Sequence, residues 1–240
     1  MPPEDSFGLA GKTIDQLRFE EAVGEGGFSV VYRGMHVGLD EPVAIKCLKL
    51  PTSLEAELVE QFILRFRAEC KLCYRLSQGS LAIVRSVTSG TTYAPSGALV
   101  PYMALEWLEG RSLGVELRER LNRGESMTLE DAIALLDPAV QAIAHAHSQG
   151  IVHRDIKLAN LFVTRGPTGM PLVKLLDFGI SKVNPFATTD LDMTTTSVML
   201  GSPRFMSPEQ MRDPRSVDAR TDVWALGVIL YRLVGGVLPF

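Results

Sequence analysis

The sequence has few cysteines, no excess of basic residues and no long hydrophobic run. Its 240 residues include only 3 cysteines, too few for the disulfide framework of a small secreted protein. A formal net charge of -4 argues against a nucleic-acid-binding surface. The longest hydrophobic run, residues 223–231, is shorter than a membrane-spanning helix, and the N-terminus lacks the basic and hydrophobic segments of a secretory signal. We therefore expect a cytoplasmic protein that has no membrane segment and binds no nucleic acid.

The composition that is present fits an ordered protein with a substantial core. Hydrophobic residues make up 46% and charged residues 22%, which argues against disorder, and the length allows one large domain or two lobes. Residues 1–17 are polar and are predicted to be a lead-in, residues 18–106 show mostly strand patterns, and residues 107–240 show mostly helical ones. Strands are predicted over residues 19–23, 30–34, 42–48, 83–88, 98–106, 161–164 and 172–176. Helices are predicted over residues 55–76, 129–148 and 222–233.

A polar run between two hydrophobic segments is the first candidate site. Residues 153–160 read His-Arg-Asp-Ile-Lys-Leu-Ala-Asn, with Gly-Ile-Val before them and Leu-Phe-Val after them. A buried polar group needs a partner, so such a run is costly in a core unless it has a function. We therefore expect it to be a site.

The glycine-rich stretch and the following strand form a second candidate. Residues 24–29 read Gly-Glu-Gly-Gly-Phe-Ser, and glycines let a backbone approach a phosphate chain closely. Taken alone, the stretch is better explained as an ordinary glycine-rich hairpin. Lys46 lies in the strand sequence Val-Ala-Ile-Lys, where a lysine is either an edge charge facing water or a partner for a buried anion.

Glu69 is a carboxylate on the hydrophobic face of the first predicted helix. It follows Phe66 by three residues, and a carboxylate there needs a cation, for which Lys46 is the candidate. The alternatives are a solvated glutamate at the margin of this face, or Glu60 in the same role. Cys70 and Cys73 have no second cysteine pair or histidine cluster to complete a metal site, so they are predicted to be core residues.

The second predicted helix has clear end signals. Thr128, with an aspartate three residues later, predicts the N-cap, Gly150 predicts the end, and Pro138 predicts a kink or a broken hydrogen bond. His145 and His147 are two residues apart, so they point to different sides and are expected to be surface or packing residues. The third helix is hydrophobic on nearly every side and is predicted to be buried. The buried side of the second helix is predicted to carry Ile133, Leu136, Val140 and Ile143.

These motifs occur in an order that resembles the protein kinases. The sequence has a Gly-x-Gly-x-x-Ser-x-Val stretch, Val-Ala-Ile-Lys, His-Arg-Asp-x-Lys-x-x-Asn, Asp177-Phe178-Gly179 and Ser207-Pro208-Glu209. The lysine at position 157 makes this loop resemble that of the serine/threonine kinases. Residues 201–210 resemble the bacterial eukaryotic-like kinases. The resemblance implies an α+β, bilobal fold. Residues 18–106 would form a small antiparallel β-sheet lobe with one helix, and residues 107–240 would form the hinge and a mainly helical lobe that is incomplete.

The resemblance also implies the partners and the role of each motif. ATP, Mg²⁺ and a protein substrate would bind, Asp155, Lys157 and Asn160 would be catalytic, and Asn160 with Asp177 would hold Mg²⁺. Leu105 would border the adenine pocket, and Asp222 would steady the catalytic loop. The nucleotide would contact Val23, Gly24, Glu25, Gly26, Gly27, Phe28, Ser29, Val30, Val31, Ala44, Lys46, Glu69, Glu106, Leu108 and Phe162. Arg154 would pair with a phosphate on one of Thr188, Thr189, Thr194, Thr195, Thr196, Ser197 and Ser202.

The sequence departs from the family pattern at three positions, and each change is mild. Ser29 replaces the third glycine, Leu158 replaces a proline, and Ser207 replaces an alanine. Kinase domains also normally continue through further helices, including one with an arginine partner for Glu209. The alternatives to an active kinase are a catalytically silent, nucleotide-binding scaffold and a truncated fragment. A hydrophobic face left open in a fragment would favour association.

Overall fold

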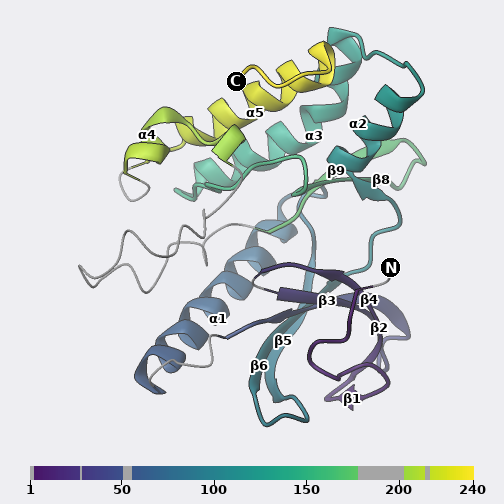
Figure 1. Ribbon diagram of the computed structural model, residues 1–240, viewed down its shortest axis with the longest axis vertical. Helices are drawn as coiled ribbons and strands as arrows, with labels where there is room; N and C mark the ends of the chain where they lie inside the picture. Colours follow the sequence, from purple (N-terminus) through teal and green to yellow (C-terminus); the bar gives the residue numbers. More distant parts are fainter. Residues whose placement is uncertain (1–2, 28, 51–55, 178–202, 214–216) are drawn as a thin grey trace. The chain divides into compact units, whose positions relative to one another are not determined.

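The structure is a computed structural model that describes residues 3–27, 29–50, 56–177, 203–213 and 217–240 (Figure 1). It divides into two compact units, which we call the strand unit (Met1–Arg75 and Arg85–Leu108) and the helical unit (Leu76–Val84 and Glu109–Phe240). Compared with the expected boundaries, residues 1–17 belong to the strand unit and residues 76–84 to the helical unit. None of the helices in the described ranges is long and hydrophobic enough to cross a membrane.

The strand unit contains an antiparallel sheet with the strand order β1-β2-β3-β4-β6-β5 (Figure 1). Alternating side chains bury one face of each strand, as the period of two in the sequence predicts. The strands are β1 Thr13–Ile14, β2 Leu17–Glu25, β3 Ser29–His36, β4 Glu41–Leu48, β5 Ser86–Tyr93 and β6 Leu99–Glu106. The helix of this unit, α1, spans Ala56–Gln78 and agrees with the predicted helix to within two residues.

Strand β5 differs from the predicted strand of residues 83–88, which ended before Gly90. The strand runs from Ser86 to Tyr93, and Gly90 pairs with Tyr102 of β6. A Cβ atom at position 90 would lie 2.5 Å from the Tyr102 hydroxyl. Glycine is therefore needed inside the strand because the tyrosine side chain occupies the space above it.

Residues before β2 form part of the core instead of a lead-in. The side chain of Leu9 is fully buried in the same cluster as Leu17, Phe19 and Tyr32. The carboxylate of Asp5 accepts a hydrogen bond of 2.5 Å from the Tyr32 hydroxyl and also caps the backbone N–H of Leu9 at 3.1 Å. A polar segment can thus close a sheet, because its carboxylate satisfies a buried hydroxyl.

The helical unit combines helices with a small sheet of strand order β7-β8-β9. Its α3 has the predicted bounds, Thr128 caps it, and Gly150 follows its end with a left-handed φ of 73°. The helix continues through Pro138. The sequence did not predict α2. The elements are α2 Leu113–Asn122, α3 Leu129–Ser148, the 3-10 helix η2 Pro203–Phe205, α4 Pro208–Arg212, α5 Arg220–Gly235, β7 Arg111–Ser112, β8 Leu161–Arg165 and β9 Pro171–Leu175.

The buried face of α3 differs from the prediction. Leu136 and Ile143 are buried as expected, but the side chains of Ile133 and Val140 are exposed. The remaining buried positions are Ala132, Ala139, Ala142 and Ala146. Small alanine side chains let α5 and β9 pack closely against α3, so the contact face is turned away from the larger residues. Helix α5 is likewise not buried all round: Val223 and Tyr231 are exposed.

Candidate active site

The polar run of residues 153–160 forms an irregular loop that precedes β8 in the helical unit. Arg154 has a left-handed φ of 64°, which is uncommon for a residue other than glycine. The buried carboxylate of Asp222, at the start of α5, accepts hydrogen bonds of 2.8 Å from the backbone N–H groups of both His153 and Arg154. The expected role of Asp222 is therefore confirmed by its geometry, because these bonds hold the strained backbone in place.

His147 completes this support, although its place in the sequence did not predict the contact. Its Nε2 lies 2.8 Å from Oδ2 of Asp222, although it was expected to be a surface or packing residue. The two residues are 75 positions apart, so spacing gave no signal. His147 thus helps to fix the aspartate that holds the loop.

A second chain of hydrogen bonds supports Arg154 from α4. Ser207 is fully buried and its hydroxyl lies 2.8 Å from that of Thr221, which donates to Gln210 at 2.9 Å. Gln210 in turn donates to the carbonyl oxygen of Arg154 at 2.7 Å. Ser207, the departure from the family's alanine, therefore gains a buried partner in Thr221.

The loop places Asp155, Lys157 and Asn160 together. Nζ of Lys157 lies 3.1 Å from Oδ2 of Asp155, and Nδ2 of Asn160 donates to the same carboxylate oxygen at 2.7 Å. Nδ2 also donates to the carbonyl oxygen of Asp155 at 2.8 Å. The Asp155 carboxylate is buried and fixed from two sides, as a positioned proton acceptor requires.

His153 is a structural member of the loop. It is fully buried, and its Nδ1 accepts a hydrogen bond of 3.2 Å from the backbone N–H of Asp155. Burial lowers its pKa, although the nearby carboxylates of Asp222 and Asp155 act in the opposite direction. His153 is therefore held as a neutral acceptor that orients Asp155.

Asn160 and Asp177 supply a donor set that fits Mg²⁺. Among the described residues, both hydrogen bonds of the Asn160 side chain use Nδ2, so its Oδ1 remains as a possible ligand. The backbone N–H of Leu176 donates to the carbonyl of Asn160 at 2.8 Å, which brings Asp177 next to the loop. Mg²⁺ prefers oxygen ligands. The other residues of this region, Phe178, Gly179 and the hydroxyl-bearing residues 188–202, lie outside the described part of the chain.

In the strand unit, Lys46 lies on the less buried face of the sheet. Val43, Ile45 and Cys47 of β4 point into the core, so Ala44 and Lys46 point the other way. Lys46 pairs in register with Val31 of β3, whose side chain shares this face. Val30 is an exception among the predicted nucleotide contacts. Its side chain is fully buried in the core, so only its backbone could face a ligand.

Glu69 occupies the buried face of α1, as predicted. It is 4% exposed, whereas the alternative Glu60 is exposed. Burial raises the pKa of the neighbouring Cys70 thiol to about 11. The charge of Glu69 adds to this effect and that of Lys46 opposes it, so both charges lie near this thiol. Cys70 and Cys73 are buried core residues, which confirms their interpretation.

The glycine-rich turn between β2 and β3 has space around it. Gly26 closes the turn by donating its N–H to the carbonyl of Ser29 at 2.8 Å. A Cβ atom at Gly26 would meet only that carbonyl oxygen at 3.9 Å, and one at Gly27 would meet nothing within 4 Å. Neither residue has a positive φ. Neither the backbone conformation nor a described neighbour therefore requires glycine at these two positions. A ligand that lies close to the backbone would require it.

The remaining predicted contacts are spread over both units. Val23, Gly24 and Glu25 lie on β2, Glu106 ends β6, and Leu108 follows it. In the helical unit, Phe162 lies on β8, paired with Lys174 of β9. Phe28 lies outside the described residues. The meeting of Lys46 with Asp155 and Asp177 around one triphosphate stays a prediction.

Comparison with known proteins identifies the family. A model described as "Protein kinase domain" matches residues 17–240. The chain is 34% identical over 97% of its length to the serine/threonine-protein kinase Pkn1 of Myxococcus xanthus, and 34% identical over 94% to PknB of Mycobacterium tuberculosis. It is 35% identical over 91% to PknL of Mycobacterium bovis.

The chain covers 30%, 33% and 49% of the lengths of these three relatives. It thus corresponds to a part of each of them. Residues 17–240 extend over almost the whole chain and include both the glycine-rich turn and the catalytic loop. The chain belongs to the protein kinase domain family, and its relatives are bacterial serine/threonine kinases.

Proposed function

We propose that the chain transfers the γ-phosphoryl group of ATP to serine or threonine hydroxyls of a protein substrate. The observation that carries this proposal is the geometry of the loop. A buried carboxylate, Asp155, is fixed by Lys157 and Asn160 on a backbone that Asp222 holds. Phosphoryl transfer requires a carboxylate that is held in this way, with a cation beside it.

In this reaction the substrate hydroxyl oxygen forms a bond to the γ-phosphorus, and the bond from that phosphorus to the bridging oxygen breaks, which releases ADP. Asp155 orients the hydroxyl and accepts its proton. Lys157 lies beside this carboxylate and would steady the transferred group. Because the transition state is loose, positioning and charge neutralisation supply most of the catalysis.

One group of residues would hold the nucleotide, and a second group would hold the metal. Lys46 would pair with the α- and β-phosphates, with Glu69 orienting it, and Gly24 and Gly26 would let the turn lie close to the phosphates. Asn160 and Asp177 would hold Mg²⁺, which when bound neutralises charge on the phosphate oxygens. A cytoplasmic location remains part of the proposal.

The experiment compares the purified chain with its Asp155→Asn variant, using radiolabelled ATP, Mg²⁺ and a mixture of protein substrates. We expect label on serine or threonine and a loss of about 10²- to 10⁴-fold in the variant, because the proton acceptor is removed. Asp137→Asn is the matched control: the same chemical change at an exposed position of α3 should leave transfer unchanged.

Thermal stabilisation by ATP and Mg²⁺ without any transfer would contradict the proposal and favour a silent nucleotide-binding module. Aggregation with neither stabilisation nor transfer would favour an incomplete fragment. Equal transfer by the parent chain and the Asp155→Asn variant would reject the role of this carboxylate.

A further inference from the structure

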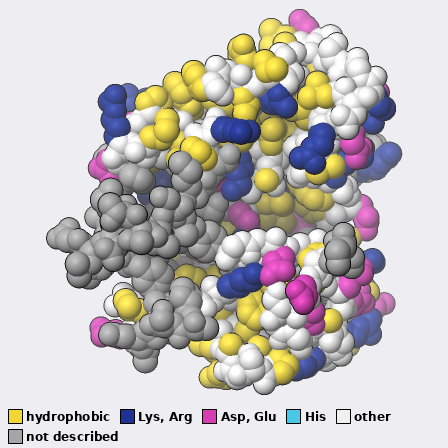
Figure 2. All heavy atoms as spheres, in the orientation of Figure 1, with side chains coloured by type: hydrophobic (Ala, Val, Ile, Leu, Met, Phe, Trp, Pro, Cys, Tyr) yellow, Lys and Arg dark blue, Asp and Glu magenta, His cyan; other side chains and the backbone are white. Residues whose placement is uncertain are grey.

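A groove of about 580 Å³ lies in the helical unit next to the catalytic loop. Its walls come from α2, the loop residues 157–159, η2 and the C-terminal end of α5 with the residues after it. In Figure 2, Lys and Arg side chains lie among hydrophobic ones over the helices of this unit. The position and charge of the groove point to a ligand that reaches the loop from this side.

Four cationic side chains line the groove: Lys157, Arg118, Arg204 and Arg232. Among the described residues that line it, none is an aspartate or a glutamate. Arg118 and Arg204 are exposed, and neither makes a hydrogen bond or ion pair with the described part of the chain. Lys157 is paired with Asp155, so the positive charge of the groove comes from its three arginines, although the whole chain carries a net charge of -4.

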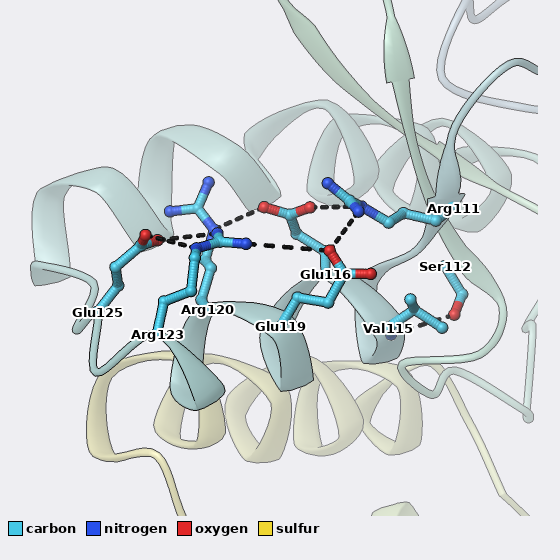
Figure 3. Close-up of polar contacts among 8 residues, drawn as sticks. All are labelled: Arg111, Ser112, Val115, Glu116, Glu119, Arg120, Arg123 and Glu125. Carbon is cyan, nitrogen blue, oxygen red and sulfur yellow. Dashed lines mark hydrogen bonds and ion pairs between the residues drawn. The ribbon is translucent and has the colours of Figure 1, made fainter.

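The carboxylates Glu116 and Glu119 of α2 pair with arginines that do not line the groove (Figure 3). Glu116 accepts from Nε of Arg111 at 2.8 Å and from Nε of Arg120 at 2.7 Å. Glu119 also pairs with Arg111, and lies 3.9 Å from Nη1 of Arg123. The partners of these two carboxylates in the described chain are thus Arg111, Arg120 and Arg123, and not the groove residue Arg118.

Between the cations the groove is hydrophobic. Val115 and Leu121 of α2, Leu158 of the loop and Phe205 of η2 line it. Lys157 connects the groove to the proposed chemistry, since its Nζ lies 3.1 Å from Asp155. A chain segment whose hydroxyl reaches Asp155 would therefore continue directly into the groove.

We propose that this groove binds the protein substrate and selects segments in which acidic residues, with hydrophobic ones between them, flank the phosphorylated serine or threonine. The inference rests on the proposed kinase function and adds a substrate class to it. Carboxylates of the substrate pair with Arg118 and Arg204, and its hydrophobic side chains cover Leu158 and Phe205. Charge complementarity of this kind determines specificity more than affinity.

The test uses short serine peptides that differ only in whether the flanking residues are glutamate, glutamine or lysine. With ATP and Mg²⁺, we expect kcat/KM to be about tenfold higher for the glutamate peptide than for the glutamine peptide, and lower still for the lysine peptide. Two or three exposed charge pairs are sufficient for such a ratio. The preference should decrease as salt is added, because exposed charges are screened.

A charge-reversed variant, Arg118→Glu with Arg204→Glu, should lose the preference for glutamate or prefer lysine. Its matched control is Arg165→Glu, an exposed arginine at the end of β8 outside the groove, which should keep the preference. Binding of the same peptides to the Asp155→Asn variant, followed by fluorescence anisotropy, should show the same order without turnover.

The outcomes separate the two proposals. Transfer to the peptides with no preference, or with a preference for lysine, overturns the inference and leaves the kinase function standing. Absence of transfer to every peptide counts against the kinase function, while selective binding of the glutamate peptide in the anisotropy experiment would still support the groove. If the Arg165→Glu control changes the preference as much as the double variant does, net charge and not the groove is responsible.

Discussion

The catalytic loop and helix α2 use the same kind of group, a carboxylate with several donors, in opposite surroundings. Asp222 has a side chain that is 1% exposed and accepts two backbone N–H groups besides its contact with His147. Glu119 has a side chain that is 41% exposed and pairs with two arginines (Figure 3). A donor that loses a buried acceptor cannot turn to water, whereas an exposed arginine can. Burial, and not the number of contacts, therefore decides how much each carboxylate matters.

The largest effect in this comparison is expected for Asp222→Ala. The change leaves the N–H groups of His153 and Arg154 without an acceptor and releases the left-handed backbone at Arg154. We expect the free energy of unfolding to fall by about 3 kcal/mol or more, with loss of phosphoryl transfer. Urea denaturation measures the first quantity and the radiolabel assay the second.

The conservative variant Asp222→Asn gives an internal control, because its amide retains one acceptor oxygen. It should lie between the parent chain and the alanine variant. If Asp222→Ala instead has the stability and activity of the parent chain, the loop does not depend on this carboxylate.

An intermediate effect is expected for Glu116→Gln, since this side chain is only 11% exposed and bonds both Arg111 and Arg120. Burial tends to raise the pKa of Glu116, but its hydrogen bonds to the two arginines outweigh burial and lower it below the usual 4.5. We expect a loss of about 1 kcal/mol in the free energy of unfolding at neutral pH. Urea denaturation at several pH values measures it.

The stabilisation by Glu116 should depend on pH. Because the folded pKa lies below the unfolded one, the stabilisation is fully present above pH 4.5 and is lost as the pH falls through the lower, folded pKa. The difference between the parent chain and Glu116→Gln should therefore shrink on acidification. A difference that grows below pH 4.5 would contradict the assignment.

The smallest effect is expected for Glu119→Gln, whose side chain is exposed. Its arginine partners can be solvated when the charge is removed, so the melting temperature should change by at most about 2 °C. The remaining difference should disappear in high salt. A destabilisation as large as that of Glu116→Gln would show that the exposed part of the α2 network is coupled to the buried part. Scanning calorimetry of the Glu116→Gln, Glu119→Gln double variant would measure this coupling.

The sequence pointed to the loop residues because their contacts are local. His153 to Asn160 form one continuous run, and the contacts of Asp155 with Lys157 and Asn160 join near neighbours in the chain. Glu69 was found because a carboxylate interrupts a hydrophobic face. In each case a short-range pattern carried the information.

The residues that were missed act over long separations or through packing. His147 and Gln210 reach the catalytic loop from α3 and α4, and no spacing rule connects them to it. The exposure of Ile133 on α3 follows from which neighbours pack there, which periodicity alone does not specify. The predicted strand ended before Gly90, because the reason for a glycine there is the side chain of Tyr102 on the next strand.

The segment before β2 has a practical consequence for producing this domain. The family match begins at residue 17, yet Leu9 is fully buried and Asp5 accepts the hydroxyl of Tyr32. A recombinant protein that starts at residue 17 would lack Leu9, which leaves a cavity in the core of the strand unit. It would also lack Asp5, which leaves the buried Tyr32 hydroxyl without its acceptor. The expressed protein should therefore begin no later than Asp5, because the folded unit includes residues that precede the family match.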